Sequence, residues 1–390
     1  MVLGPGRGIA GFIRGQVMDG EFCGGSLSDP LAPAKGAEIP PVQIGRLPHN
    51  RIGGEGTASA STSRSLFIRA HGSRHSITSM THNKFQMPRI DRVATLYLCH
   101  PVARLLGLNS GARVPILMYH SISDNLFAKP HPYYQINTSP NVFSQQMRWL
   151  RHNGYRTMDL PEMWAAMETG QDLSKTVVIT FDDGYQDFYT DGLPVMKQCG
   201  FTATIFLATD RIQDTSVRVE GADYLTWREV RELYAEGIRF GSHTVTHPDL
   251  RSLGPEQIDY ELGYSKEIIE QKLGVSIRSF SYPYAFPEED RDFTRYLVDS
   301  LKNHGFENGV STIIGRAKAG NNCFCLPRLP VNSWDDPSLL RAKLEGGYDW
   351  LHWPQLCRKF LHQNACLMQS SSSTESEKAN HSSVSAGRSR

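Results

Sequence analysis

The sequence predicts an α/β fold, a distorted (β/α) barrel of about seven strands. Short apolar runs rich in β-branched residues alternate with longer segments of helical periodicity from Val114 to about residue 335. Strands that alternate with helices form parallel sheets, and this many repeats fit a sheet that closes on itself. A doubly wound open sheet is the alternative, but no Gly-rich phosphate loop follows the first strand.

The expected elements follow one another without an internal repeat. Ser139 is expected to cap a helix that has Pro140 in its first turn, and Gly154 is expected to end it. The expected strands span residues 114–119, 176–181, 202–207, 238–241, 277–282, 309–313 and 328–331. The expected helices span residues 139–154, 186–198, 226–236, 255–273, 288–303 and 337–344.

The barrel is expected to occupy residues 111–335, with segments of different character on both sides. Residues 87–110 are expected to form an amphipathic lead-in helix, interrupted at Pro101, that packs on the barrel or lies on a membrane surface. After the barrel, we expect a helical extension over residues 336–366 and a disordered Ser-rich tail over residues 367–390.

Residues 1–86 have the composition of a segment without a packed core. Gly, Ser, Pro, Arg and Thr dominate, so we expect disorder, or a native start at Met80 or Met87. The basic-then-apolar pattern of a secretory signal is not visible, which leaves localisation open between the cytoplasm and the cell envelope. No apolar run approaches the roughly 18–20 residues of a transmembrane helix. With 41 basic and 40 acidic residues, the chain has no global field that favours nucleic acid.

Two adjacent carboxylates follow a strongly predicted strand. The apolar run that ends at Phe181 leads into Asp182 and Asp183, and Gly184 permits the chain to turn sharply there. Two neighbouring acids at the edge of a sheet repel each other and lose solvation. A solvated Asp-Asp-Gly turn is the alternative, and these residues alone do not decide between the two interpretations.

Two histidines four residues apart, His243 and His247, follow a neighbouring expected strand. The carboxyl ends of parallel strands meet at one end of a barrel, so we expect these imidazoles to lie close to the two carboxylates. One carboxylate and two imidazoles suit a divalent cation, with zinc expected first and cobalt, nickel or manganese as alternatives. The spacing alone also arises by chance on helical turns.

The remaining polar side chains at strand ends suggest how such a site would work. Adjacent residues at a strand end point in different directions, so one carboxylate can bind the cation while the other faces its water and takes a proton. A third histidine, His120, follows the first expected strand and is the candidate proton donor for the leaving nitrogen.

Four segments resemble known motifs. Thr180-Phe-Asp-Asp-Gly184 and His243-Thr-Val-Thr-His247 resemble the first two motifs of the polysaccharide deacetylases, the NodB-like carbohydrate esterase family 4. Phe280-Ser-Tyr-Pro-Tyr284 resembles the third motif of that family. The opening Val114-Pro-Ile-Leu-Met-Tyr-His120 resembles the permuted branch that contains the poly-N-acetylglucosamine deacetylases. The resemblance covers about residues 112–335 and implies a barrel with fewer than eight strands.

The resemblance implies a metal-dependent hydrolase that removes N-acetyl groups from an N-acetylated sugar or polysaccharide. The implied metal ligands are Asp183, His243 and His247. The implied catalytic residues are Asp182 as the general base, His120 as the general acid, and Tyr284, whose backbone N–H would face the oxyanion. An O-acetyl carbohydrate esterase, a carbohydrate-binding barrel with weak or no turnover, and an interaction protein built on the barrel are the alternatives.

The sequence departs from the family pattern at two points. Ser281 occupies the place of an arginine that orients the base in many members, and Arg278 or Arg328 is expected to replace it. The family's downstream Leu-x-Ile-x-His motif is not recognisable, and His120 is expected to take the role of its histidine.

Four further residues have two open interpretations each. The aromatic rings of Tyr185, Tyr282 and Trp227 would either stack on sugar rings or pack in the core. Asp249 would either orient a metal-binding imidazole or serve as a turn residue.

Overall fold

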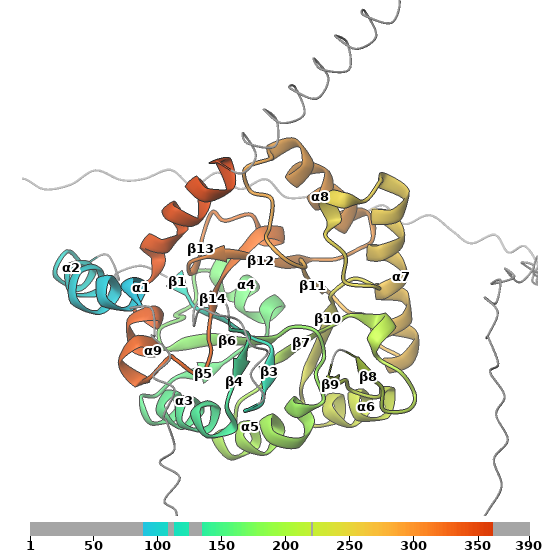
Figure 1. Ribbon diagram of the computed structural model, residues 1–390, viewed down its shortest axis with the longest axis horizontal. Helices are drawn as coiled ribbons and strands as arrows, with labels where there is room; N and C mark the ends of the chain where they lie inside the picture. Colours follow the sequence, from blue (N-terminus) through green and yellow to red (C-terminus); the bar gives the residue numbers. More distant parts are fainter. Residues whose placement is uncertain (1–88, 108–112, 125–134, 220, 362–390) are drawn as a thin grey trace, which may run out of the picture. The chain divides into compact units, whose positions relative to one another are not determined.

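Seven parallel strands close into a barrel in the described part of the chain. The structure is a computed structural model that describes residues 89–107, 113–124, 135–219 and 221–361. Neighbouring strands follow the order β2-β14-β12-β11-β10-β7-β6, and β2 pairs with β6 to close the circle (Figure 1). The strands are β2 (Ile116–Tyr119), β6 (Thr176–Phe181), β7 (Thr204–Leu207), β10 (Arg239–Ser242), β11 (Ser279–Ser281), β12 (Asn308–Ile314) and β14 (Leu326–Pro330). The predicted distorted (β/α) barrel of about seven strands is therefore confirmed.

A ring of helices surrounds the strands (Figure 1). Its members are α3 (Pro140–His152), α5 (Leu193–Cys199), α6 (Trp227–Ala235), α7 (Pro255–Leu273) and α8 (Arg291–Asn303). Their ends follow from local sequence: the Ser139 side chain caps α3, and Thr226 forms a capping box with Glu229 at the start of α6. Gly200 and Gly274 end α5 and α7 in the left-handed conformation. A π-helical segment, η3 (Phe188–Gly192), precedes α5.

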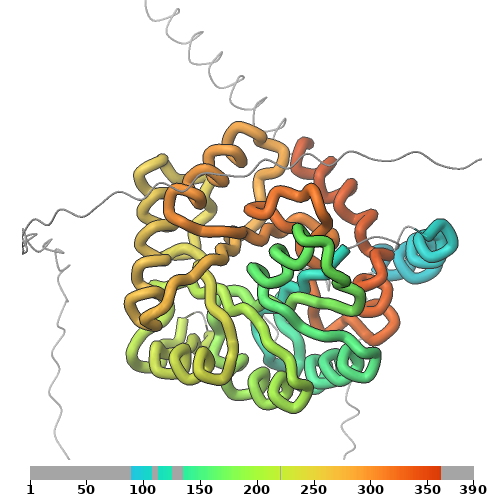
Figure 2. Tube along the Cα trace, turned by 180° about the vertical axis from the view of Figure 1, so that it is seen from behind, coloured from blue at the N-terminus to red at the C-terminus, as the bar shows by residue number. Residues whose placement is uncertain are grey.

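The short strand β5 (Arg156–Thr157) and the helix α4 (Leu160–Glu168) are present in addition to the predicted elements. A capping box between Asp159 and Glu162, with proline in the first turn, starts α4 and was detectable in the sequence. Leu160 and Met163 of α4 belong to the same apolar cluster as strand residues such as Phe206. Seen from behind, α4 lies across one end of the barrel and covers it (Figure 2).

Alternate strand residues belong to two apolar clusters. Ile116, Val178 and Phe206 pack with α4, whereas their neighbours Leu117 and Ile179 pack in a larger cluster that includes residues of the surrounding helices. This alternation is the period of two expected of strands that are covered on both faces. The barrel interior is thus filled with side chains, so a substrate-accessible site can form only among the loops at its ends.

The expected lead-in helix is present as α1 (Ile90–Ala94), the π-helical segment η1 (Thr95–Cys99) and α2 (His100–Leu105). Pro101 lies in the first turn of α2, where proline is tolerated, and the helical path continues through it, so the predicted interruption at Pro101 is wrong. A π-helical turn, η1, comes directly before α2. Polar contacts attach this segment to the rest of the chain: the Trp350 Nε1–H donates to Thr95 at 3.1 Å, and His100 contacts Glu345 at 2.8 Å.

The expected C-terminal extension is also helical where the structure describes it. It comprises α9 (Pro337–Leu344), the 3-10 turn η7 (Asp349–Leu351) and helical residues 352–361. Across the described ranges, no helix combines the length and apolar character that crossing a membrane requires. The expected disordered regions, residues 1–86 and 367–390, lie outside the described residues.

Short elements complete the described structure. The strand pairs are β1 (Arg113–Val114) with β13 (Ala317–Lys318), β3 (Ser121–Ile122) with β4 (Asn137–Thr138), and β8 (Arg218–Val219) with β9 (Ala222–Asp223). The 3-10 turns are η4 (Thr209–Arg211), η5 (Leu250–Ser252) and η6 (Cys323–Cys325).

Candidate active site

The polar residues predicted at strand ends lie together at the carboxyl end of the barrel. His120 follows β2, Asp182 and Asp183 follow β6, and His243 follows β10. Because β2 pairs with β6, and β7 alone separates β6 from β10, these residues come from one side of the ring. Parallel strands therefore bring together side chains that are far apart in the sequence.

The backbone at the site is left-handed at several residues other than glycine. Asp183 has φ 74°, His247 has φ 60° and Tyr284 has φ 54°. Gly184, with φ 80°, confirms the sharp turn predicted after the two carboxylates. Left-handed backbone costs free energy for residues with a Cβ, and such residues cluster at functional sites. At Asp183 this conformation turns the chain directly after Asp182 and separates the surroundings of the two carboxylates.

Asp183, His243 and His247 form a cluster that could hold a metal ion. The Nε2 atoms of His243 and His247 lie 3.5 Å and 3.3 Å from Asp183 Oδ1. One potential ligand atom from each residue lies within 4.8 Å of the others. Asp183 Oδ1 is buried and makes no hydrogen bond among the described residues. A buried carboxylate oxygen that faces two imidazole nitrogens fits a divalent cation of the zinc type.

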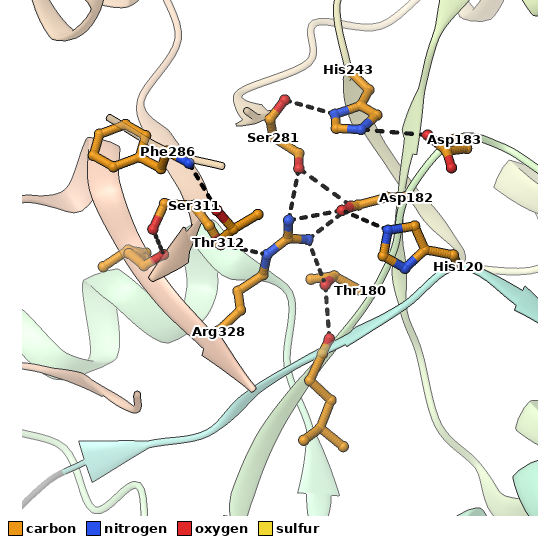
Figure 3. Close-up of polar contacts among 12 residues, drawn as sticks. His120, Thr180, Asp182, Asp183, His243, Ser281, Phe286, Ser311, Thr312 and Arg328 are labelled. Atoms are coloured by element: carbon orange, nitrogen blue, oxygen red, sulfur yellow. Dashed lines mark hydrogen bonds and ion pairs between the residues drawn. The ribbon is translucent and has the colours of Figure 1, made fainter. Parts of the chain in front are cut away.

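The two imidazoles are oriented differently. His243 Nδ1 lies 2.7 Å from the Ser281 carbonyl oxygen, an arrangement in which Nδ1–H donates and Nε2 is left as an acceptor (Figure 3). In the described structure His247 Nδ1 is buried without a hydrogen-bond partner. Burial and the nearby His243 lower the pKa of His247 to about 4, so its ring is neutral at pH 7, as a metal ligand must be.

Asp182 is held by Arg328, one of the two arginines predicted to replace the family arginine. Arg328 Nη1 and Nη2 donate to Asp182 Oδ1 and Oδ2, each at 2.8 Å (Figure 3). The guanidinium also donates to the Ser311 carbonyl oxygen at 2.9 Å and to the Ser281 hydroxyl oxygen at 3.1 Å. The Arg328 side chain is fully buried, so this fork has little freedom to move.

The environment of Asp182 favours its ionised form. Burial acts to raise the pKa of this carboxyl, but the charge and hydrogen bonds of Arg328 more than offset burial and lower the pKa well below its usual value. Ser281, which stands where the family arginine is expected, donates its hydroxyl to Asp182 Oδ1 at 3.3 Å. Serine leaves room there for the side chain of Arg328, which reaches the same carboxylate from β14.

His120 lies beside Asp182 and apart from the metal-ligand cluster. Its Nε2 atom is 3.9 Å from Asp182 Oδ2, and its side chain is 19 % exposed (Figure 3). Burial lowers the pKa of His120, against the opposing effect of Asp182 and Asp183. Tyr284 also lies near the cluster. Its side chain is 56 % exposed, and its ring centroid lies 4.8 Å from that of His247.

The structure corrects the expectation that three aromatic residues line a sugar groove. Tyr185, Tyr282 and Trp227 are 7 %, 2 % and 4 % exposed, so their ring faces are covered by other side chains. Burial and Asp183 raise the pKa of Tyr185, whose hydroxyl is hydrogen-bonded to Asp183 and Tyr224. Tyr185 therefore contacts the metal-ligand cluster from the core side, and the core interpretation applies to all three.

Two predicted supporting residues do not support the site. Arg278 precedes β11, at the end of the barrel away from the site, and its half-exposed side chain contacts Glu307 at 3.5 Å. Asp249 caps the turn η5 and pairs with Arg251, so the turn interpretation holds for it. Both predictions rested on nearness in sequence to a motif, which does not determine direction.

Glu261, on helix α7, was not among the predicted site residues, yet it accepts hydrogen bonds from the backbone between the two histidines. A signal existed, because Glu261 lies on the same face of α7 as the buried residues Ile258, Leu262 and Ser265. An acid on the buried face of an amphipathic helix needs hydrogen-bond partners. The pair of Tyr224 and Arg211, joined at 2.9 Å behind Tyr185, had no comparable sequence signal.

Comparisons with known proteins agree with this geometry. The family described as Polysaccharide deacetylase matches residues 169–309. YxkH of Bacillus subtilis (strain 168), whose name places it among the polysaccharide deacetylases, is 32 % identical over 240 residues, which cover 60 % of this chain and 77 % of YxkH. A poly-beta-1,6-N-acetyl-D-glucosamine N-deacetylase of Staphylococcus aureus (strain MSSA476) is 22 % identical over 236 residues, or 55 % of this chain and 78 % of the relative.

Among solved structures, the Streptococcus pyogenes deacetylase PplD in complex with acetate is similar to this chain. The match has a TM-score of 0.52 and 26 % sequence identity, and it covers 60 % of this chain and 99 % of PplD.

Proposed function

The chain belongs to the polysaccharide deacetylase family, and from this membership we propose that it is a metal-dependent hydrolase that removes N-acetyl groups from an N-acetylated sugar polymer. The observation that carries the proposal is the division between Asp182 and Asp183. One adjacent carboxylate is paired with Arg328, while the other faces two imidazole nitrogens. A hydrolase needs both environments, whereas a protein that only binds sugar needs neither.

Asp183, His243 and His247 would hold the cation. The buried Asp183 Oδ1 and the two Nε2 atoms provide three donors of the kind that zinc, cobalt and nickel accept. When bound there, such a cation would polarise the amide carbonyl of the substrate and lower the pKa of a water molecule.

Asp182 would act as the general base and His120 as the general acid. Arg328 keeps Asp182 ionised, so its carboxylate can accept the proton that a water molecule loses on attacking the carbonyl carbon. His120 lies beside Asp182, with its Nε2 atom 3.9 Å from Asp182 Oδ2, and it can return a proton to the leaving nitrogen. The backbone N–H of Tyr284, in its left-handed turn, is the proposed donor to the oxyanion, and its exposed ring is the proposed sugar contact.

The relatives support an N-acetylated polymer of hexosamine as the substrate class. One of them is named as an N-deacetylase of poly-beta-1,6-N-acetyl-D-glucosamine, a polymer of N-acetylated hexosamine in which the bond to be cleaved is an amide. Within this class the barrel, residues 111–335, is the proposed catalytic unit, because every proposed ligand and catalytic residue lies inside it.

The test is acetate release from N-acetylglucosamine oligomers and from the β-1,6-linked polymer, by the full-length chain with and without a chelator. We expect the chelator to abolish release and added zinc or cobalt to restore it, because three protein ligands leave the cation exchangeable. An O-acetylated sugar serves as the comparison substrate. Release that survives complete metal removal would contradict the mechanism, and preference for the O-acetyl ester would replace the amidase proposal with an esterase.

A further inference from the structure

A buried carboxylate of helix α7, Glu261, holds the middle of the turn that carries both histidine ligands. Glu261 Oε2 accepts hydrogen bonds from the backbone N–H groups of Val245 at 2.7 Å and Thr246 at 2.9 Å. The other oxygen, Oε1, accepts from the Thr246 hydroxyl at 2.8 Å. Glu261 is 5 % exposed, so both of its oxygens are occupied in a buried setting. Hydrogen bonds that involve a charged group are stronger than those between neutral groups.

This turn has no regular secondary structure to fix its conformation. Strand β10 ends at Ser242, directly before His243, and Thr244 and His247 both have left-handed backbone, with φ 69° and 60°. Two left-handed residues with a Cβ cost free energy and persist only where surrounding contacts impose them. The backbone N–H groups between them also need acceptors, and Glu261 supplies these.

The position of His247 depends on the turn more than that of His243 does. His243 is oriented through its ring, because Nδ1 contacts the Ser281 carbonyl oxygen. The Nδ1 atom of His247 makes no hydrogen bond among the described residues, although its backbone N–H donates to the Thr244 hydroxyl at 3.0 Å. The direction of the His247 ring therefore depends on the backbone of this turn, which Glu261 and backbone N–H groups of η4 hold, and on contacts with the neighbouring rings of His243 and Tyr284.

A second residue of α7 contacts the start of the same turn. Ser265, one helical turn after Glu261, has its hydroxyl 2.6 Å from that of Ser242. The Ser242 hydroxyl oxygen in turn accepts from the Thr244 N–H at 3.2 Å. Helix α7 thus contacts the beginning and the middle of the turn, and Glu261 provides the only charged group in these contacts.

We propose that Glu261 is a positioning residue that fixes His247 in the geometry required to bind a divalent cation. The inference rests on the proposed metal-dependent function. Glu261 does not reach the cation; it acts through the backbone of Val245 and Thr246. Residues that orient metal ligands typically contribute about 10–100-fold to metal affinity.

The experiment titrates the metal-free, full-length chain with cobalt(II) and follows the visible absorption of the bound ion together with the dissociation constant. The variants are Glu261→Gln and Glu261→Ala, with Glu267→Gln as the control, since Glu267 is an exposed acid on the same helix. Thr246→Val removes one of the three contacts and provides a milder variant should loss of the carboxylate prevent folding.

We expect affinity for cobalt to fall by about 10-fold in Glu261→Gln and by up to about 100-fold in Glu261→Ala. Thr246→Val should weaken binding less, and the control should match wild type. The cobalt spectrum should change in the Glu261 variants, because displacement of His247 alters the coordination. If Glu261 had a purely structural role, its substitution would lower the thermal midpoint of the metal-free chain. Cobalt affinity and the cobalt spectrum, measured well below that midpoint, would then be unchanged.

Folded Glu261 variants that bind cobalt with wild-type affinity and spectrum would overturn the proposal, as would an unaffected Thr246→Val if neither Glu261 variant folds. These results would leave the proposed function intact, because the wild-type chain would still bind cobalt. A wild-type chain that takes up no cobalt would instead overturn the metal centre itself, and the role of Glu261 with it.

Discussion

Asp182 and Asp187 lie close together in the sequence and both have buried oxygens, yet their surroundings favour opposite charge states. Asp182 receives a bidentate pair of hydrogen bonds from Arg328, which lowers its pKa. Asp187 has the Ser121 hydroxyl at 2.5 Å and the Ile122 backbone as partners. Burial prevails over these neutral donors and raises the pKa of Asp187 to about 6.

The difference shows that burial by itself does not determine what a carboxylate can do. A full positive charge with fork geometry outweighs the cost of desolvation, whereas one hydroxyl and a backbone N–H do not. Asp182 can therefore serve as a base at neutral pH, while Asp187 is ionised there at a cost to stability. Ser121 directly follows His120, so Asp187 contacts the chain beside the site, through the Ser121 hydroxyl and the Ile122 backbone, without taking part in the site.

The largest expected effect comes from removing the proposed general base. Asp182→Asn should lower the rate of acetate release by about 10²–10⁴-fold, because general base catalysis typically contributes that much. Cobalt binding should persist in this variant, since Asp183 is the proposed ligand. The matched variant Asp183→Asn should instead lose cobalt binding, and its loss of acetate release should follow from the missing cation. Equal loss of cobalt binding in both variants would contradict the division of labour between the two carboxylates.

A smaller effect on acetate release is expected when the positive charge beside Asp182 is kept but the bidentate hydrogen bonds of Arg328 are lost. Arg328→Lys replaces two parallel hydrogen bonds with a single ammonium group, which stabilises the ionised carboxylate less. The pKa of Asp182 should then rise, and the acid limb of kcat/KM should move to higher pH. The measurement is a pH profile of acetate release, for which Arg278→Lys is the control because its side chain is half exposed and remote from the site. An acid limb identical to that of wild type would show that Arg328 does not set the charge state of Asp182.

The ion pair of Asp182 and Arg328 also predicts how the free energy of unfolding depends on pH. The folded-state pKa of Asp182 lies below its ordinary value of 3.8, so its pairing with Arg328 stabilises the fold above that value. This contribution is lost as the pH falls further, toward the folded-state pKa. Arg328→Lys should therefore reduce the free energy of unfolding most near neutral pH and least in strong acid, as denaturant titration can measure. A reduction of equal size at all pH values would indicate lost packing instead of lost charge pairing.

The smallest expected effect concerns Asp187. Its pKa rises from 3.8 to about 6 on folding, so the folded state binds the proton more tightly and loses stability as pH rises through that range. Two pKa units correspond to at most about 3 kcal/mol. Asp187→Asn removes the titration, and the difference in unfolding free energy between variant and wild type should grow in favour of the variant from pH 4 to pH 6. Glu267→Gln is the control, because Glu267 is an exposed acid on α7 that does not act on Asp187. A difference that stays flat over this range would contradict the assignment.

The sequence by itself determined the barrel and the positions of the chemistry-bearing residues along it. The apolar run of β6, the turn at Gly184 and the caps of helices such as α3 and α6 depend on neighbouring residues, so local patterns were sufficient. Once a parallel barrel is predicted, residues that follow its strands must meet at one end. That is why Asp183, His243 and His247 could be grouped before their distances were known.

Only the tertiary structure decided which partners these residues have. Arg278 and Arg328 were equal candidates in the sequence. In the structure Arg278 precedes β11, whereas Arg328 lies within β14 and reaches Asp182 beside the small side chain of Ser281. Tyr185 faces the core instead of a sugar, and Glu261 reaches the histidine turn from a helix. Such contacts join segments that are distant in the sequence, and their directions follow from side-chain packing, which no local periodicity encodes.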